Sequence, residues 1–287
     1  MTINRQIFAG AYRAVSRVGR GLGFHSEMVS ADYLKRIAAW ARELSERELE
    51  IARAGITEKS YHANEVILAR GDEFDYWTGV ITGLARVGIV SRSGKVTSFI
   101  AVTPGAWFGE GGMLRNEARP YDAVALRNTR LAMMDRATFS TLFDNSIGFN
   151  HFLVRQFNER LSQFVALLEC SRTLEATARL ARCIAWLFNP LLYPGANPHL
   201  EITQEEIGAL SGLSRQNANR CLKELERQGL LRLEYGGMTI VNLEGLRRYD
   251  EVRKSARDYS DKFTCVPKRM LMAEGSFAPT GRQKSLS

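Results

Sequence analysis

Side chains that can read the base edges of DNA stand close together near residue 215. Arg215 and Arg220 carry planar guanidinium groups, whose paired donors match the O6 and N7 acceptors of guanine. Gln216 carries an amide, which matches the donor and acceptor pair of adenine. The two arginines lie about one and a half helical turns apart, so both can face one groove. The chemistry indicated is recognition of base pairs.

Two short helices joined at a glycine are predicted to position this cluster. Thr203 is a suitable N-cap residue, and Glu206 follows three residues later, as in a capping box. Gly212 ends the first helix because glycine accepts the positive φ of a tight turn. Ser214 then caps a second helix, which has Ala218, Cys221, Leu222 and Leu225 on one face. The arrangement predicts a helix-turn-helix.

A β-hairpin is predicted after the second helix. Gln228-Gly229 ends that helix, and residues 231–234 and 238–241 are short runs on either side of Gly236-Gly237. The hairpin would be the wing of a winged helix-turn-helix. The alternative is an amphipathic helix pair of a small α domain, which would leave the arginine, asparagine and glutamine cluster without a purpose.

The run ITQEEIGALSGLSRQNANRCLKELERQGLL, residues 202–231, resembles the winged helix-turn-helix of the cyclic-AMP receptor/FNR (Crp/Fnr) family of transcription regulators. The resemblance implies a homodimer that binds double-stranded DNA, with RNA polymerase as a further partner. It places Arg215, Gln216 and Arg220 at the three base-reading positions, and Thr203, Gln204 and Ser214 at phosphates. The family's usual middle residue is glutamate, so we expect a changed half-site at that base. The predicted DNA-contacting residues are Thr203, Gln204, Ser214, Arg215, Gln216, Asn217, Asn219 and Arg220.

Short β-type runs separated by glycine-containing turns fill residues 58–134. Many short strands at regular turn spacing predict an antiparallel sandwich or barrel. Gly71-Asp72, Thr82-Gly83-Leu84 and residues 104–110 also resemble the jelly-roll effector domain of the same family, so the resemblance spans roughly residues 44–241. The predicted strand runs are 65–68, 76–81, 84–90, 96–102 and 131–134.

A second candidate site follows these strands, at residues 108–114 (FGEGGML) and 119–126. A glycine-rich backbone beside an arginine can cradle a phosphate, and a glutamate can accept a hydrogen bond from a ribose hydroxyl. The segment resembles the family's phosphate-binding cassette, with Glu110 and Arg119 as its anchors. The alternative is a turn at Gly111-Gly112 with Arg119 in a surface ion pair.

The cassette departs from the pattern of the family's cyclic-AMP binders. They have serine or threonine followed by alanine where this chain has Pro120 and Tyr121. The two hydroxyl residues that would face adenine align with Phe164 and Val165. We therefore expect an effector other than cyclic AMP, and leave open an unidentified nucleotide or anion, or none. The candidate effector residues are Gly109, Glu110, Gly111, Arg119, Phe164 and Val165.

Residues 137–168 return to helical spacing and end in a long apolar stripe. Such a stripe can cover the barrel on one side and pair with its own copy as a coiled coil, or it can be an ordinary core helix. DNA reading favours the dimer, because one recognition helix contacts too few base pairs to be selective. The stripe consists of Phe149, Phe152, Leu153, Phe157, Leu161, Phe164, Val165 and Leu168.

The composition narrows the classes of function. The 287 residues allow about two domains, and the formal net charge of +8 has the sign expected of a polyanion binder. The cysteines are scattered and the histidines isolated, so we expect no metal site, no cofactor and no enzyme. No apolar run approaches the ~20 residues of a membrane span, and a cytoplasmic protein is expected. The rival hypothesis is a barrel enzyme or nucleotide-binding module whose helix-turn-helix contacts protein.

The predicted organisation is α+β. An antiparallel jelly-roll effector domain at 44–145 is followed by a dimerisation helix at 146–172 and a winged helix-turn-helix domain at 173–246. Residues 1–43 are expected to be a basic, partly helical extension. Residues 247–287 are expected to hold a basic helix and a disordered tail.

Overall fold

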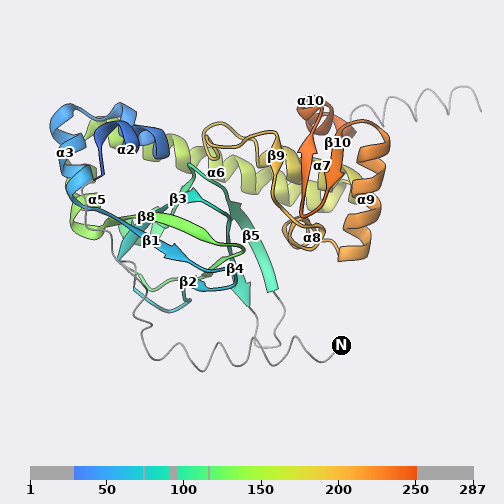
Figure 1. Ribbon diagram of the computed structural model, residues 1–287, viewed down its shortest axis with the longest axis horizontal. Coiled ribbons are helices and arrows are strands. Elements are labelled where there is room, and N and C mark those ends of the chain that lie inside the picture. Colours follow the sequence, from blue (N-terminus) through green and yellow to red (C-terminus); the bar gives the residue numbers. More distant parts are fainter. Residues whose placement is uncertain (1–28, 74, 91–95, 116, 251–287) are drawn as a thin grey trace, which may run out of the picture. The chain divides into compact units, whose positions relative to one another are not determined.

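The computed structural model describes residues 29–73, 75–90, 96–115 and 117–250 (Figure 1). The expectations for the first 28 residues and for the tail after residue 250 fall outside these ranges. The described residues combine helices with antiparallel sheets, so the predicted α+β class is confirmed. They contain no helix that is long and apolar enough to cross a membrane.

Two four-stranded antiparallel sheets form the effector domain, in the orders β1-β8-β3-β6 and β2-β7-β4-β5. The five predicted strand runs are confirmed as β2, β3, β4, β5 and β8. Three short strands, β1, β6 and β7, complete the sheets and were not predicted. The strands are β1 Ile56–Tyr61, β2 Val66–Leu68, β3 Tyr76–Thr82, β4 Ala85–Val90, β5 Val96–Val102, β6 Trp107–Phe108, β7 Asp122–Ala125 and β8 Thr129–Asp135.

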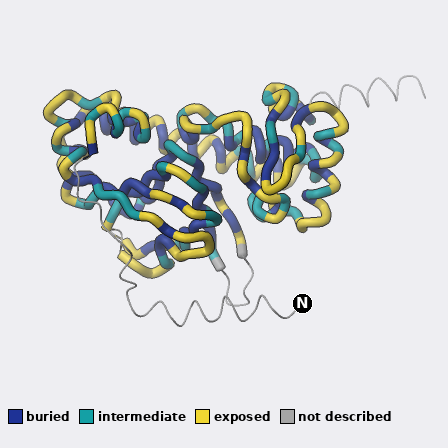
Figure 2. Tube along the Cα trace, in the orientation of Figure 1, coloured by how far each residue is buried: buried dark blue, intermediate teal, exposed yellow. Residues whose placement is uncertain are grey.

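An aromatic cluster holds the first sheet against the helices. The rings of Trp77 and Trp107 lie 4.6 Å apart between centroids, and Trp40 contacts both at 5.4 and 5.2 Å. Phe149 meets Trp40 and Trp77 edge-on. Most residues of β3 and β8 are buried, and dark blue marks buried residues along the trace in Figure 2. Aromatic pairs of this geometry add to the stabilisation from burial alone.

The segment before the first strand contributes to this core. It contains helix α2 (Ala31–Ile37), the 3-10 turn η1 (Ala39–Glu43) and helix α3 (Glu46–Ala54). Ser45 caps α3 in a capping box with Glu48, and its hydrogen bonds lower the pKa of the Glu48 carboxyl. Trp40 is fully buried, so η1 is part of the packed domain.

The glycine-rich segment after β6 is a short helix, α4 (Glu110–Arg115), and the turn considered at Gly111-Gly112 is wrong. Helix α5 (Arg136–Asn145) follows β8 and leads into the long helix α6 (Ile147–Thr173). Phe149, Phe152 and Leu153 of α6 are buried in the aromatic core. The first part of the predicted apolar stripe therefore belongs to the interior of the domain.

The C-terminal domain was predicted from residue 173, but its first helix, α7 (Ala176–Trp186), begins later because α6 continues to Thr173. Helices α8 (Gln204–Ser211) and α9 (Arg215–Arg227) follow. The predicted hairpin is confirmed as β10 (Leu231–Glu234) and β11 (Gly237–Ile240), with its turn one residue earlier, at Tyr235-Gly236. A third strand, β9 (His199–Leu200), pairs with β11, and helix α10 (Leu243–Arg247) follows.

Candidate nucleic-acid interface and barrel site

Helix α9 presents the predicted base-reading residues to solvent. Ser214 caps the helix by accepting a hydrogen bond from the backbone N–H of Asn217 at 3.3 Å. Arg215, Gln216 and Arg220 are exposed on the outer side. The opposite face is fully buried and consists of Ala218, Cys221, Leu222 and Leu225. The apolar packing therefore fixes which side chains of this helix remain free for a ligand.

A close contact between α8 and α9 sets the angle of the helix-turn-helix. Gly208 of α8 faces Ala218 of α9, and a Cβ atom on Gly208 would lie 3.1 Å from the Ala218 Cβ atom. Gly212 takes a left-handed conformation with φ of 69°, which a glycine adopts without steric cost. The helices can therefore approach and turn as the predicted motif requires.

Asn219 and Gln204, both predicted to contact DNA, form a hydrogen bond with each other. The Asn219 side-chain amide donates to the Oε1 atom of Gln204 at 2.5 Å, which ties α9 to the first turn of α8. The Gln204 amide nitrogen can still donate to a phosphate, because the bond uses only its oxygen. Asn219 is half-buried, so its role here is to orient Gln204.

Thr203 and Glu206 form the predicted capping box at the start of α8. The Thr203 hydroxyl accepts from the Glu206 backbone N–H at 3.2 Å, and the Glu206 carboxylate accepts from the Thr203 N–H at 2.7 Å. The cap uses the hydroxyl oxygen as an acceptor, so the O–H of Thr203 can donate to a phosphate. The exposed position of Thr203 suits that contact.

A buried ion pair occupies the centre of the barrel site. The carboxylate of Glu110, the first residue of α4, lies 3.2 Å from the Nε atom of Arg160 on α6. Glu110 also accepts from the indole N–H of Trp77 at 3.4 Å. The preceding Gly109 has φ of 100°, in the left-handed region that favours glycine. The predicted anchor Glu110 is thus engaged by side chains of its own chain.

Arg160 belongs to a buried polar stripe that sequence reasoning missed. Arg160 donates to the backbone oxygen of Trp107 at 2.6 Å, and Gln156 donates to the same oxygen at 3.2 Å. Gln163 donates to the Tyr193 hydroxyl at 3.5 Å. Gln156, Arg160 and Gln163 are spaced by four and then three residues, which places them on one face of a helix. Because apolar and charged residues lie between them, this face was not recognised in the sequence.

Arg119 is the second predicted anchor, and it lies 4% exposed beneath the surface. Its Nε atom donates to the backbone oxygen of Glu73 at 2.9 Å, and burial lowers the pKa of its guanidinium. The alternative of a surface ion pair is therefore wrong. Tyr121 lies within the electrostatic reach of both anchors, and burial, reinforced by the Glu110 charge, raises its pKa to about 12.

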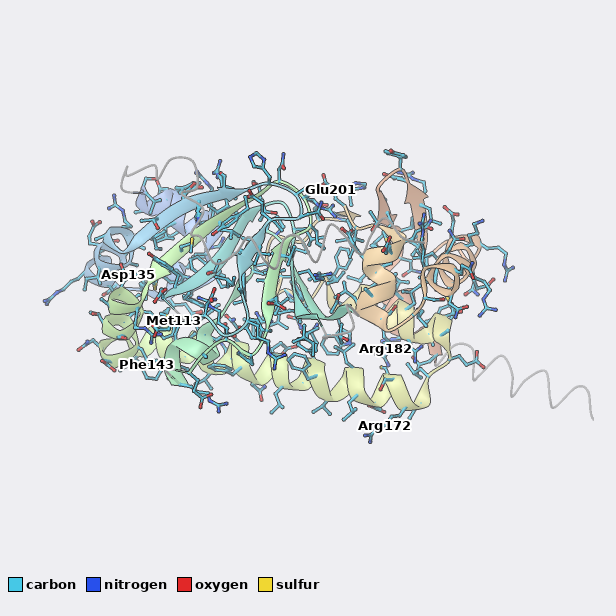
Figure 3. The ribbon with its side chains drawn as sticks, turned by 90° about the horizontal axis from the view of Figure 1, so that it is seen from below. Met113, Asp135, Phe143, Arg172, Arg182 and Glu201 are labelled. Atoms are coloured by element: carbon cyan, nitrogen blue, oxygen red, sulfur yellow. The ribbon has the colours of Figure 1, made fainter. Side chains whose placement is uncertain are left out.

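Phe164 and Val165, the candidate effector residues of α6, do not face the barrel site of their own chain. Phe164 is 46% exposed and Val165 is 58% exposed, on the outer face of α6. Figure 3 shows α6 extending to the labelled Arg172, with side chains projecting outward along its length. The structure thus brings Glu110, Arg160 and Tyr121 into one neighbourhood and leaves Phe164 and Val165 to solvent.

The described residues contain no cluster of side chains that could bind a metal ion. No group of three histidine, cysteine or acidic side chains there could hold an ion. Cys170, Cys183 and Cys221 are buried as free thiols, and burial raises the pKa of the Cys183 thiol to about 12. A thiol with so high a pKa is a poor nucleophile, because the thiolate is the reactive form.

Comparison with known proteins matches both halves of the chain. The cyclic nucleotide-binding domain family matches residues 58–146, and the Crp-like helix-turn-helix domain family matches residues 178–249. The cyclic AMP receptor protein of Thermus thermophilus is 26% identical over 197 residues, which cover 69% of this chain and 89% of that protein. The transcriptional regulator SdrP of the same organism is 27% identical over 202 residues, 69% and 96% of the two chains.

A solved structure shows the same arrangement of domains. The crystal structure of a transcriptional regulator of the CRP/FNR family from Thermus thermophilus aligns with a TM-score of 0.52 and 26% sequence identity. The alignment covers 68% of this chain and 98% of that chain. Both halves of the fold therefore occur together in a known regulator.

Proposed function

The chain belongs to the Crp/Fnr family of transcription regulators, and we propose that it acts as a homodimer that binds an inverted DNA repeat without using cyclic AMP. As a sequence-specific DNA-binding regulator it combines a cyclic nucleotide-binding domain with a Crp-like helix-turn-helix. The exposed apolar residues on the outer face of α6 support the proposed dimer. The exposed recognition residues of α9 support sequence-specific DNA binding.

The outer face of α6 has the spacing of a coiled coil. Large apolar residues that are 37–74% exposed recur there at alternating steps of three and four after a first step of seven. This 3.5-residue period keeps one apolar seam in line with a partner helix. The seam residues are Ile147, Val154, Phe157, Leu161, Phe164 and Leu168.

The inner face of the same helix supports this assignment. Gln156, Arg160 and Gln163 are buried against the helix's own chain, although they are polar. A helix that buries polar residues and exposes a row of leucine and phenylalanine has its apolar partner outside the chain. A second copy supplies the same seam, and a twofold interface then brings two recognition helices to one DNA.

The barrel site argues against cyclic AMP. A cyclic phosphate needs hydrogen-bond donors, and Pro120 offers neither a side-chain hydroxyl nor a backbone N–H. The carboxylate that would accept from a ribose hydroxyl is already paired with Arg160. A ligand would have to break a buried ion pair before it could use Glu110, which costs free energy. A different nucleotide or anion, or no effector, fits this site better.

The matched relatives are regulators, and the same role accounts for the further partners we propose here. A regulator that binds DNA through two recognition helices acts on RNA polymerase in the cytoplasm, where both are present. No catalytic residue is needed for this role, because the output is occupancy of a DNA site. We therefore propose that the chain is not an enzyme.

Mobility shift and sedimentation test the proposal together. Purified protein is mixed with fragments of its source genome and, separately, with random fragments of equal length. We expect a subset of genomic fragments to shift at nanomolar protein in physiological salt, and sedimentation to give a dimer. Equal retardation of all fragments, or a monomer that binds selectively, would contradict the proposal.

A further inference from the structure

Arg127 of the barrel domain forms hydrogen bonds and an ion pair with the start of the helix-turn-helix. Arg127 lies in the turn between β7 and β8, and its Nη2 atom is 3.0 and 3.2 Å from the two carboxylate oxygens of Glu206. Glu206 is the third residue of α8. The Nη1 atom of Arg127 donates to the backbone oxygen of Glu201 and lies 3.6 Å from the Glu201 carboxylate.

The contact engages the group that starts the helix. The Glu206 carboxylate accepts from the Thr203 N–H in the capping box while it binds Arg127. The side chains of Arg127 and Glu206 are 22% and 16% exposed, so water screens this pair less than it screens a surface ion pair. The guanidinium therefore holds α8 at its N-terminal end, next to the phosphate-contacting positions Thr203 and Gln204.

A second contact lies beside the first. Gly195, in the loop before β9, packs against the backbone of Pro104 so closely that a Cβ atom would lie 2.3 Å from the Pro104 oxygen. Gly105 has φ of 82° and faces the same loop. A cavity of about 200 Å³ is lined by residues of both contacts, including Arg127 and Gly195. The packing is thus not continuous here, although α8 also contacts β5 of the barrel domain and packs against α7 and α9.

The negative charge at the start of α8 gives Arg127 a second role, as a counter-charge. Glu201, Glu205 and Glu206 place three carboxylates in or just before the first turn. These charges repel DNA phosphates, and Arg127 compensates two of them directly. Loss of the arginine would remove this anchor and leave Glu201 and Glu206 without its positive charge beside the DNA backbone.

We propose that Arg127 is a positioning residue for DNA binding, which holds α8 in the orientation that presents the recognition helix. The inference rests on DNA binding through α8 and α9, and not on the dimer or on the effector. It goes beyond the helix-turn-helix itself, because it makes the affinity for DNA depend on a residue of the barrel domain.

Affinity measurements on four variants test this role. Dissociation constants are measured by fluorescence anisotropy for Arg127→Ala, Arg127→Lys, Glu206→Gln and the double variant Arg127→Ala/Glu206→Gln. The probe is the tightest duplex selected by the unaltered protein from a random library. Glutamine at position 206 retains the capping box, so Glu206→Gln removes the charge while it keeps the helix start. Arg130→Ala is the matched control, because Arg130 pairs with Glu58 within the barrel domain.

We expect Arg127→Ala to weaken binding about fivefold or more, Arg127→Lys to weaken it less, and Arg130→Ala to stay within about twofold. The double variant should bind no more weakly than Arg127→Ala, because both changes break one interaction. The slope of affinity against salt should not change, since Arg127 does not touch phosphate. A slope reduced by about one would show a direct phosphate contact instead.

Two further results would overturn the inference. Arg127→Ala binding within twofold of the unaltered protein would remove any positioning role. Multiplicative losses in the double variant would mean that Arg127 and Glu206 act independently. Thermal unfolding of each variant identifies any that is not folded, and Arg127→Lys, which retains the charge, then provides the comparison. Loss of specific binding in every protein, the unaltered one included, would count against DNA binding itself.

Discussion

The Nε atom of Arg160 lies 3.2 Å from the Oε1 atom of Glu110, and both residues are more than 90% buried. The pair joins the long helix α6 to the first residue of α4. The same helix carries the exposed apolar seam on its outer face. A ligand that competed for Glu110 would therefore act directly on the helix that we assign to the dimer.

Breaking the pair should destabilise the barrel domain. Arg160→Ala leaves the Glu110 carboxylate buried without its cation, and the loss of one partner of a buried pair costs about 3–5 kcal/mol. We expect the free energy of unfolding in urea to fall by at least about 2 kcal/mol. Arg155→Ala is the control on the same helix, because Arg155 pairs with Glu43 at a more exposed site. Equal small losses in both variants would show that the buried pair is not special.

Cyclic AMP should not bind at micromolar concentration. Pro120 lacks two donors, a side-chain hydroxyl and a backbone N–H, and Phe164 and Val165 offer the purine amine no acceptor, so three hydrogen bonds to the ligand are absent. Each loss costs about 1–3 kcal/mol when the group stays desolvated. At about 2 kcal/mol each, the three losses together weaken binding by more than about a thousandfold at ~1.4 kcal/mol per decade. Titration calorimetry is the measurement. A micromolar affinity that disappears in Arg119→Ala would contradict this prediction.

A charge in the apolar seam of α6 should separate the dimer. Leu161→Glu places a carboxylate in a desolvated coiled-coil position, where an unpaired charge is costly. We expect light scattering to give a monomer mass at micromolar protein. Ser162→Glu is the matched control, because it adds the same charge to an exposed residue one position outside the seam. An intact dimer in Leu161→Glu would place the interface elsewhere.

Loss of either recognition arginine should weaken specific binding and relax base choice. Arg215→Ala or Arg220→Ala removes a guanidinium that matches guanine, at a cost of about 1–3 kcal/mol on the specific site. Arg227→Ala, at the far end of α9 where Arg227 pairs with Glu224, should have little effect. Anisotropy with specific and random duplexes separates the outcomes. An equal loss of affinity for both duplexes would show that these arginines contact only phosphates.

Local signals in the sequence predicted the DNA-binding half well. The hydroxyl caps at Thr203 and Ser214 and the left-handed Gly212 each act within one helical turn. Features that depend on distant partners were missed. Strand β9 has only two residues and forms because it pairs with β11, about forty residues later. The six-residue helix α4 contains two glycines, so its local propensity favours a turn.

The barrel site shows the same division. Glu110 was found from its neighbours in sequence, but Arg160 was not predicted as part of the site. Its partner lies fifty residues away, so only the packed structure brings the two together. Trp40 likewise enters the core from a segment assigned to an extension, because its ring contacts come from β3, β6 and α6. Contacts between residues this far apart cannot be predicted from the spacing of residues along the chain.

Selection of binding sites from a random duplex library measures whether the protein reads DNA sequence as a dimer. The full chain is bound to the library at physiological salt, and the retained duplexes are sequenced over several rounds. A dimer with two recognition helices predicts an inverted repeat whose half-sites are centred about one helical turn, roughly 10 base pairs, apart or a multiple of it. A library that shows no enriched sequence, or one enriched only in a single unrepeated site, would contradict the account.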